Sequence, residues 1–315
     1  MNVHRYVVEV ALVISLLFVP GRAAAQLTTL RVGFNGFHGA APLYLGEEIG
    51  IFKKHGVTLE MIFISGGSLS LQALVGKSLD LLMTGGPPFI NAYLSGAKIK
   101  IIAGVTNLLP YVLIASGGIA TAEQLKGKKI GISRFGSNTD FVVKLALSQF
   151  GLSPNDVNIL QVGGSQARLA ALKSGTIHAT ILSPEEAFVA QKVGLNPLLD
   201  FTEKGFEFPH VNFVVRDEYL ETQGRVVKSL IEAYLETIRY FKAHKTEAVK
   251  KIMTLSRLDD RQIAERSYDG YMRSLPDDAR PTLKGLKLVL DAVTKENPRA
   301  KSLTVDQLLD LRFVR

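Results

Sequence analysis

The chain has 315 residues, of which 47% are hydrophobic, with 28 Gly and 12 Pro; this composition fits a globular α/β protein and excludes a disordered chain. Because it contains no Cys, disulfides, thiolate metal sites and a Cys nucleophile are excluded. The formal net charge of +8 is spread along the chain without a Lys/Arg block, and it favours anionic partners.

The first predicted element is a signal peptide over residues 1–26. Arg5 supplies its basic start, Val10 to Val19 its apolar core, and Ala23-x-Ala25 its small-residue cleavage pattern. The apolar run is shorter than the roughly 20 residues that a membrane-spanning helix needs, and an uncleaved anchor is the alternative. We therefore expect a periplasmic protein, cut near Ala25 or Gln26.

The next segment alternates between strand and helix patterns. Apolar spacing and Gly positions predict five elements in the order strand, helix, strand, helix, strand: 30–34, 43–56, 57–65, 69–77 and 78–86. This order implies a parallel sheet with right-handed crossovers.

The same order of elements returns later in the chain. Its five predicted elements are 128–133, 139–151, 157–162, 166–175 and 176–183. Both units carry Gly-Gly-Ser after the second strand and a Pro after the third. Any two βαβ units look alike, but the shared loop composition favours a repeat, 30–87 against 129–184, and hence two similar lobes.

The connections and the tail suggest how the lobes are joined. Residues 111–116 predict a strand that leaves lobe one, and 208–220 an apolar β run that returns the chain. Helical patterns follow from about 222, over 224–253, 259–275 and 282–297. Lobe one is therefore expected over 27–114 and 216–315, and lobe two over 115–215. Two crossings, near 113–117 and 211–217, would form a hinge that closes around a ligand.

Ligands of parallel α/β sheets bind outside the carboxyl ends of the strands. The loops at these ends are rich in Gly, Ser, Thr and Asn, and each precedes a helix whose first N–H groups suit an anion. The need for a short connection would explain the composition of any one loop. The same composition recurs at the strand ends of both lobes, and this recurrence predicts a binding cleft between the lobes. The candidate ligand-binding residues are Asn35, Gly36, Phe37, His38, Gly67, Ser68, Thr84, Gly85, Arg134, Ser137, Asn138, Thr139, Ser165 and Ser183.

Some of these candidates leave alternatives open. Arg134 could hold a sulfonate or carboxylate by a two-point contact, or it could be a surface Arg. Phe37 could stack on an organic ligand, and His38 could donate to an anion or be an exposed loop residue. Glu185 would repel an anion if it faced the cleft; we expect it to be a solvated first-turn residue instead.

Several stretches together resemble a known family. They are "LRVGF", "APLYLGEEIGIFKKHGVTLE", "GGSLSLQALVGKSLDLLMTGG", "ATAEQLKGKKIGISRFGSNTDFVVKLALSQFGLSPNDV" and "ARLAALKSGTIHATILSPEE". In order and spacing they resemble the ABC-transporter periplasmic solute-binding proteins of the nitrate/sulfonate/taurine type, including relatives that bind the thiamine pyrimidine precursor.

The resemblance implies an α/β, two-lobed periplasmic-binding-protein fold of the type II-like class. Each lobe would be a mostly parallel sheet flanked by helices, with the ligand cleft between the lobes. It implies ligand contacts from 35–40, 66–68, 84–86 and 136–139, and it implies a membrane permease and an ATPase as partners.

Motifs of catalysis do not emerge from the sequence. There is neither an H-E-x-x-H nor a G-x-S-x-G pattern, and the glycines at 33, 36 and 39 do not fit G-x-G-x-x-G. We therefore expect a monomeric receptor for a small organic anion, sulfonate- or carboxylate-like, and not an enzyme, with no cofactor, metal or nucleic acid. The alternatives are a pyrimidine-precursor-type binding protein or biosynthetic enzyme on the same fold, and a secreted interaction domain without a ligand.

Overall fold

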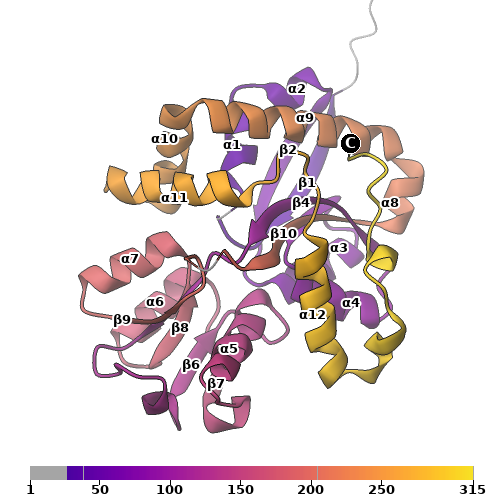
Figure 1. The fold of residues 1–315 in the computed structure, drawn as a ribbon. Helices are drawn as coiled ribbons and strands as arrows, with labels where there is room; N and C mark the ends of the chain where they lie inside the picture. Colours follow the sequence, from indigo (N-terminus) through magenta and orange to yellow (C-terminus); the bar gives the residue numbers. More distant parts are fainter. Residues whose placement is uncertain (1–26, 38, 204, 315) are drawn as a thin grey trace, which may run out of the picture.

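The computed structural model describes residues 27–37, 39–203 and 205–314. The predicted signal peptide, residues 1–26, and the candidate His38 lie outside these residues. The described chain contains two five-stranded sheets, ordered β2-β1-β3-β10-β4 and β7-β6-β8-β5-β9. Figure 1 shows that the two sheets form separate halves, with the second sheet at the lower left. We call them the first half and the second half.

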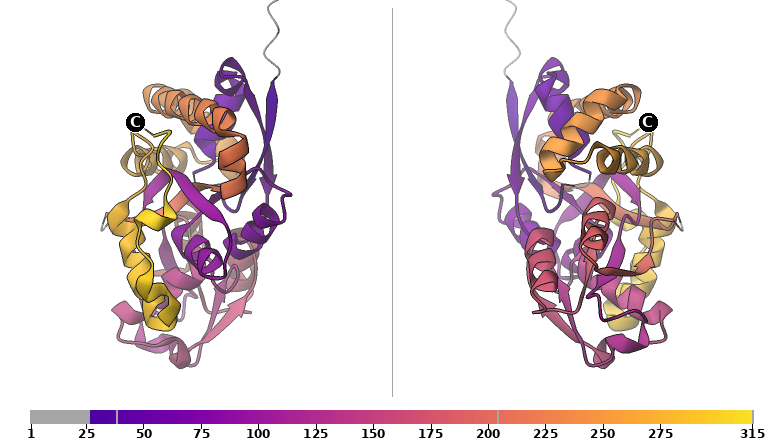
Figure 2. Two further views of the ribbon diagram at one scale, coloured as in Figure 1. Left: turned by 90° about the vertical axis from the view of Figure 1, so that its right-hand side faces the viewer. Right: turned by 90° about the vertical axis from the view of Figure 1, so that its left-hand side faces the viewer.

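The first half combines the N-terminal third of the chain with its C-terminal third. Its strands are β1 (Thr28–Phe34), β2 (Val57–Phe63), β3 (Leu81–Thr84), β4 (Ile99–Leu108) and β10 (Glu207–Arg216). Its helices are α1 (Ala41–Glu48), α2 (Ile51–Lys54), α3 (Gly67–Val75), α4 (Gly86–Leu94), α8 (Asp217–Thr222), α9 (Gly224–Ala243), α10 (Lys245–Ser256), α11 (Arg261–Ser274) and α12 (Leu283–Glu296). In the side views of Figure 2, α12 and the segment after it, in yellow, lie along one flank of the molecule.

The second half is built from the middle of the chain. Its strands are β5 (Val112–Ala115), β6 (Lys129–Ile132), β7 (Asn158–Gln161), β8 (Ala179–Leu182) and β9 (Asn196–Asp200). Its helices are α5 (Asn138–Gln149), α6 (Ser165–Lys173) and α7 (Pro184–Lys192). Short 3₁₀ turns lie in both halves: Glu123–Leu125 and Pro154–Asp156 in the second, and Pro298–Ser302 and Asp306–Leu308 after α12 of the first.

The two sheets have the same topology, which confirms the predicted repeat. β1 pairs in parallel with β2 and β3, and β6 pairs in parallel with β7 and β8. In each sheet the fourth strand is antiparallel, β10 against β3 and β5 against β8. The predicted α/β fold with two mostly parallel sheets is therefore confirmed.

The chain changes sheets earlier than the sequence suggested. The run around 111–116 forms β5, where Leu113 pairs with Ile181 of β8 and Leu199 of β9, so it belongs to the second sheet. Likewise β10 belongs to the first sheet. The crossings are thus 109–111 and 201–206, and the expected ones near 113–117 and 211–217 fall largely on β5 and β10. β5 is apolar throughout, and β10 is buried along most of its length, so no local pattern in either strand shows which sheet it joins.

Three helices also differ from the prediction. The expected helix 43–56 is divided into α1 and α2 at Gly50, whose φ of 80° cannot continue a right-handed helix. The long helix expected over 224–253 is divided into α9 and α10 at His244. No bounds were predicted for helix α4, which begins with Gly-Pro-Pro directly after the loop that follows β3.

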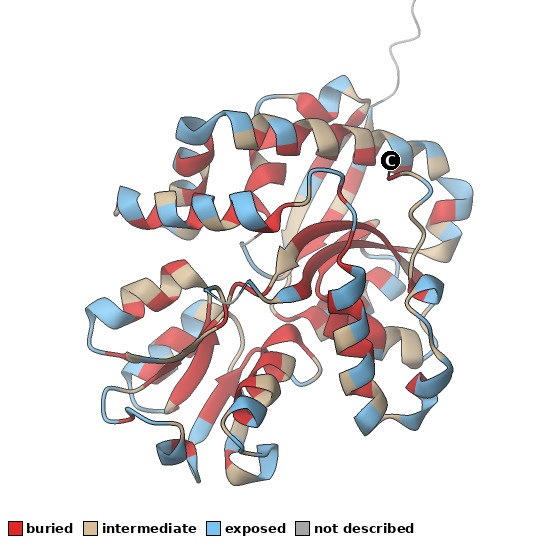
Figure 3. Ribbon diagram, viewed as in Figure 1, coloured by how far each residue is buried: buried red, intermediate tan, exposed pale blue. Residues whose placement is uncertain are grey.

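The core lies between the sheets and the inward faces of the helices. On α9, residues at helical spacing are buried against the first sheet, as predicted: Val227, Leu230, Tyr234, Ile238 and Phe241. Figure 3 shows this division, with buried residues along the strands and exposed residues on the outer sides of the helices. Among the helices that the structure describes, none is long and apolar enough to cross a membrane.

Candidate ligand-binding site

A pocket of about 700 Å³ opens between the two halves, at the carboxyl ends of strands from both sheets. Ten of the predicted ligand residues line it: Asn35, Gly36, Phe37, Gly67, Thr84, Ser137, Asn138, Thr139, Ser165 and Ser183. The repeat explains this convergence, because equivalent loops of two similar sheets face each other across the boundary. Their contact with a ligand stays a prediction.

Three predicted residues lie near the pocket but not in its lining. Ser68 Oγ donates to the backbone carbonyl of Phe135 at 2.9 Å, a contact from the first half to the second. Gly85 leaves room for Asn138, since a Cβ at position 85 would collide with that side chain. Both residues therefore shape the junction between the halves.

Arg134 is the third residue outside the lining. Its side chain is exposed and lies across Gly66, and its Nε donates to the carbonyl of Ser65 at 3.3 Å. A Cβ at Gly66, where φ is 92°, would come within 3.0 Å of Arg134 Cδ. The guanidinium thus lies on the surface where the two halves meet, and its two-point contact with an anion stays a prediction.

The start of α5 is built to present backbone N–H groups. Ser137 caps the helix by accepting from Asp140 N at 3.5 Å, and Asp140 Oδ2 accepts from Gly136 N at 2.9 Å. Hydroxyls of Ser133, Ser137 and Thr139 lie within 3.0 Å of one another. The first N–H groups of a helix have no partner inside it, so those of Asn138 and Thr139 are placed to bind an acceptor at the pocket.

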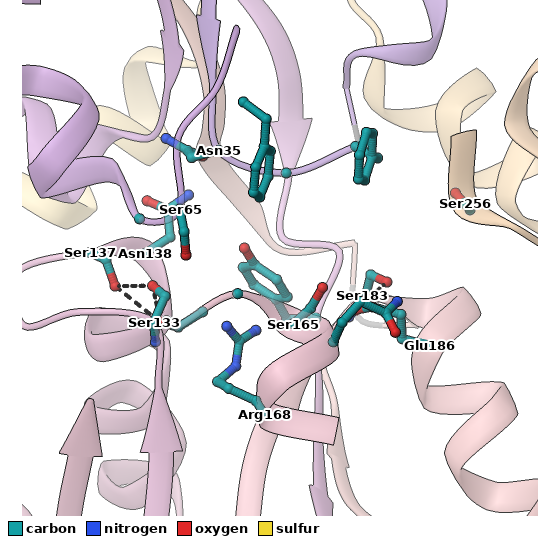
Figure 4. Close-up of a pocket in the computed structure, with 18 of the residues that line it drawn as sticks. Asn35, Ser65, Ser133, Ser137, Asn138, Ser165, Arg168, Ser183, Glu186 and Ser256 are labelled. Carbon is teal, nitrogen blue, oxygen red and sulfur yellow. Dashed lines mark hydrogen bonds between the residues drawn. The ribbon is translucent and has the colours of Figure 1, made fainter. Parts of the chain in front are cut away.

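Arg168 is a pocket residue that sequence reasoning missed. It is only 4% exposed, and its guanidinium donates to Thr180 Oγ1 (3.1 Å), Gly163 O (2.6 Å) and Ile181 O (3.0 Å). Burial lowers its pKa below the ordinary value, but an Arg side chain keeps its charge in proteins. These bonds fix a positive charge beneath the start of α6 (Figure 4).

Two acidic residues at the start of α7 also line the pocket. Glu186 forms a capping box, since its Oε2 accepts from Ser183 N at 3.3 Å and from Ser183 Oγ at 3.0 Å. Glu185 is 7% exposed, so the expectation of a solvated first-turn residue is wrong. Burial raises the pKa of both carboxyls, and the neighbouring Glu185 charge raises that of Glu186 further.

Aromatic rings form part of the pocket wall. Phe37 and Phe63 stack with their centroids 5.7 Å apart and their planes at 2°, and both keep a large exposed face. Tyr111 meets His210 edge-on at 5.0 Å, and burial raises the pKa of Tyr111 to about 12. Such a wall suits the apolar body of an organic ligand.

The missed residues had weak sequence signals. Arg168 follows the second Gly-Gly-Ser loop by one helical turn, where an Arg in a predicted helix is usually a solvated residue. Tyr111 and His210 lie on or beside the connections between the halves, which the strand-end rule does not cover. Within the described residues, no group of three or more His, Asp or Glu side chains is placed to hold a metal ion.

Comparisons with known proteins identify the family. The family model described as NMT1/THI5 like matches residues 38–248, more than half of the chain. A Brucella abortus protein named as a binding protein is 27% identical over 266 residues, which are 82% of this chain and 82% of that protein.

Solved structures show the same architecture. The alkanesulfonate-binding protein SsuA from Xanthomonas axonopodis pv. citri matches with a TM-score of 0.75 at 19% identity, covering 90% of this chain and 98% of SsuA. The periplasmic nitrate-binding protein NrtA from Synechocystis matches with a TM-score of 0.66 at 15% identity, covering 91% and 92%. At these identities the match concerns the fold. The chain is therefore a member of the NMT1/THI5-like family, and it has the fold of these periplasmic binding proteins.

Proposed function

We propose that this chain is the exported solute-binding protein of an ABC importer, which captures a small organic anion between its halves and delivers it to a permease. The observation that carries the proposal is the convergence of helix starts on one pocket. Residues at the starts of α3, α5, α6 and α7 line it, namely Gly67, Asn138, Ser165 and Glu185.

The electrostatics of this arrangement favour an anionic group. Each helix start carries a partial positive charge and unpaired N–H donors. Arg168 adds a full charge that is held from below by backbone carbonyls. Because the pocket lies between the halves, their closure on a ligand would exclude water from it, and a charge-assisted hydrogen bond is strongest where water is excluded.

A backbone donor can be removed without disturbing the fold. Ser165 is the first residue of α6, a position where Pro is accepted, and Gly164 before it has φ −59° and ψ 166°, which a following Pro requires. Ser165→Pro removes the N–H, whereas Ser165→Ala removes only the hydroxyl. Isothermal titration with an organic anion such as benzoate or valerate should show about tenfold weaker binding for the Pro variant than for the Ala variant.

The charge is tested separately by Arg168→Gln, with the exposed Arg225→Gln as control. The first should weaken anion binding by about tenfold or more, while the control leaves it unchanged. Circular dichroism checks that the Arg168 variant remains folded. If Ser165→Pro and Arg168→Gln both bind anions as the wild type does, the anion assignment fails.

Export and the absence of turnover are further parts of the proposal. N-terminal sequencing of the periplasmic fraction should give Gln26 or a residue close to it, and an intact Met1 in the cytoplasm would contradict export. Ligand recovered after incubation should be chemically unchanged, as a receptor requires; a product would favour an enzyme on this fold.

A further inference from the structure

Asn35 and Gly36 form the one Asn-Gly pair in the sequence, and they lie in the loop directly after β1. Both residues line the pocket. An Asn side chain is chemically labile when Gly follows it, because a residue without a Cβ leaves the next backbone nitrogen room to approach the side-chain amide. A reaction at this pair would therefore change the pocket itself.

The loop leaves the Gly36 nitrogen accessible. Gly36 is exposed, and its N–H has no hydrogen-bond partner within the described part of the chain. The backbone is fixed before this pair, where Phe34 O accepts from Ile64 N at 2.8 Å. It is fixed again after the pair, where Phe37 O accepts from the Tyr271 hydroxyl at 3.2 Å. Between these contacts the two residues keep the local freedom that a ring closure needs.

The Asn35 side chain is held by two long hydrogen bonds. Its Nδ2 donates to Ser70 Oγ and to Thr84 Oγ1, both at 3.3 Å, which is beyond the usual range for such bonds. These bonds are weak, so the amide can turn toward the Gly36 nitrogen. In Figure 4, Asn35 lies on the first-half side of the pocket, across from Arg168 of the second half.

We propose that Asn35 is a site of spontaneous deamidation and that this reaction ends anion capture by the pocket. The Gly36 nitrogen loses its proton to hydroxide and forms a bond to Cγ of Asn35; the bond from Cγ to Nδ2 breaks, and ammonia leaves. Water then opens the cyclic succinimide at either carbonyl and gives aspartate or isoaspartate. One water is consumed and one ammonia released, without an oxidant or reductant. The modification stands independently, whereas the loss of capture rests on the proposed function.

The product places a negative charge beside the proposed ligand. A carboxylate accepts hydrogen bonds and does not donate them, so the Nδ2 donor is lost and an organic anion in the pocket is repelled. The hydroxyls of Ser70 and Thr84 can turn to donate to the new carboxylate, so the fold tolerates it. Isoaspartate also lengthens the backbone by one carbon, which shifts Phe37 relative to its stacking partner Phe63.

Peptide mass spectrometry tests the modification after the purified protein has been kept for several days at mildly alkaline pH. Asn35 should be converted to aspartate and isoaspartate. Asn155 is the internal control: it is exposed but precedes Asp156, so it should keep its amide. An Asn35 that stays intact, or that reacts no faster than Asn155, overturns the proposal.

Gly36→Ala is the matched variant. The fold accepts it, because a Cβ at this position meets no atom within 4 Å and the φ of Gly36 is not positive. Asn35 should react about tenfold or more slowly in this variant, which requires that the methyl group raise the barrier by about 1.4 kcal/mol. An equal rate in both proteins would show that the reaction does not pass through the Gly36 nitrogen, and it would overturn the mechanism.

Isothermal titration with benzoate and valerate measures the consequence for binding. Asn35→Asp, which is one of the two products, should bind either anion about tenfold or more weakly than the fresh wild type. The aged wild type should lose binding sites in proportion to the converted fraction of Asn35. Undiminished binding by Asn35→Asp and by the converted protein overturns the loss of capture. If the fresh wild type binds neither anion, the anion assignment and the loss of capture fail together, while mass spectrometry still decides the modification.

Discussion

The Nδ2 atom of Asn138 donates a hydrogen bond of 3.0 Å to the backbone carbonyl of His210. Asn138 is the first residue of α5 in the second half, and His210 belongs to β10 in the first half. The bond is buried, and the missing side chain of Gly85 makes the approach possible. One amide thus ties the start of α5, which lines the pocket, to the opposite half; under the proposed function this bond would link ligand capture to the contact between the halves.

Asn138→Ala should loosen this contact. Loss of one buried hydrogen bond costs about 0.5–1.5 kcal/mol, and the His210 carbonyl is left without this donor. We expect ligand affinity to fall by about two- to tenfold and the ligand-free protein to have a larger radius of gyration in small-angle scattering. The control is Asn158→Ala, which removes a 3.0 Å side-chain bond to Gly127 O inside the second half. Equal radii for both variants would contradict the bridging role.

Arg134→Ala tests the surface contact between the halves. The donor Nε is charged, but its hydrogen bond to Ser65 O is exposed and 3.3 Å long, so solvent screening reduces its contribution to about 0.5–1.5 kcal/mol, and binding should weaken by about two- to tenfold. Because the guanidinium lies outside the pocket, anionic and uncharged ligands should lose affinity equally. Titration of the variant with one ligand of each kind measures this. A selective loss for the anion would show that Arg134 reaches it.

Closure of the halves around a ligand is expected from these contacts. Besides the contacts of Asn138 and Arg134, the ion pair of Lys192 with Asp260, 2.7 Å long, joins α7 to the start of α11. Each contact is weak: the two hydrogen bonds contribute about 0.5–1.5 kcal/mol each, and the exposed ion pair contributes roughly 0–1 kcal/mol. Without ligand the halves should therefore separate by rotation at 109–111 and 201–206. Small-angle scattering should show a smaller radius of gyration with saturating ligand, and identical profiles would argue against closure.

The sequence predicted the repeated part of the fold well, for a physical reason. Helices that cover a sheet show a 3.6-residue apolar period, and the buried strands appear as short apolar runs bounded by Gly-rich loops, so β1 to β3 and β6 to β8 were located within a few residues. The loops at the strand ends followed from the sheet rule, and ten candidates therefore line the pocket.

What the sequence did not predict depends on contacts between distant segments. Whether β5 joins one sheet or the other is decided by pairing with β8 and β9, which no local pattern encodes. The burial of Glu185 results from its position beside α11 of the opposite half, although its own helix turn looks like a solvated one. Arg134 lies in a strand-end loop and Arg168 one turn into a helix, and only the fold places the first outside the pocket and the second beneath it.

The burial of Glu185 should make the stability of the ligand-free protein depend on pH. Burial raises the pKa of this carboxyl above its ordinary value of 4.5, so the folded state holds its proton more tightly than the unfolded state. A group of this kind contributes most stability below the unfolded pKa, and the contribution is lost as the pH rises through the folded pKa. Within the described part of the chain, the titratable groups that interact with it include Glu186, Tyr111 and Tyr271, while hydrogen bonds with Ser183 and its own backbone partly oppose the rise in pKa. Both tyrosines have raised pKa values and stay neutral over this range.

Glu185→Gln should therefore stabilise the ligand-free protein, and the gain should grow with pH. Glu186 titrates in both proteins, so the difference between them isolates Glu185. Melting temperatures measured between about pH 4 and about pH 8 should be similar at the acidic end and diverge upward. The variant should melt about 2 °C or more above the wild type at the alkaline end, since about 1 kcal/mol moves the midpoint of a domain of roughly 150–250 residues by about 2–4 °C. The exposed Glu221→Gln should show no such trend. A constant offset across the pH range would mean that the pKa of this carboxyl is not raised in the folded state.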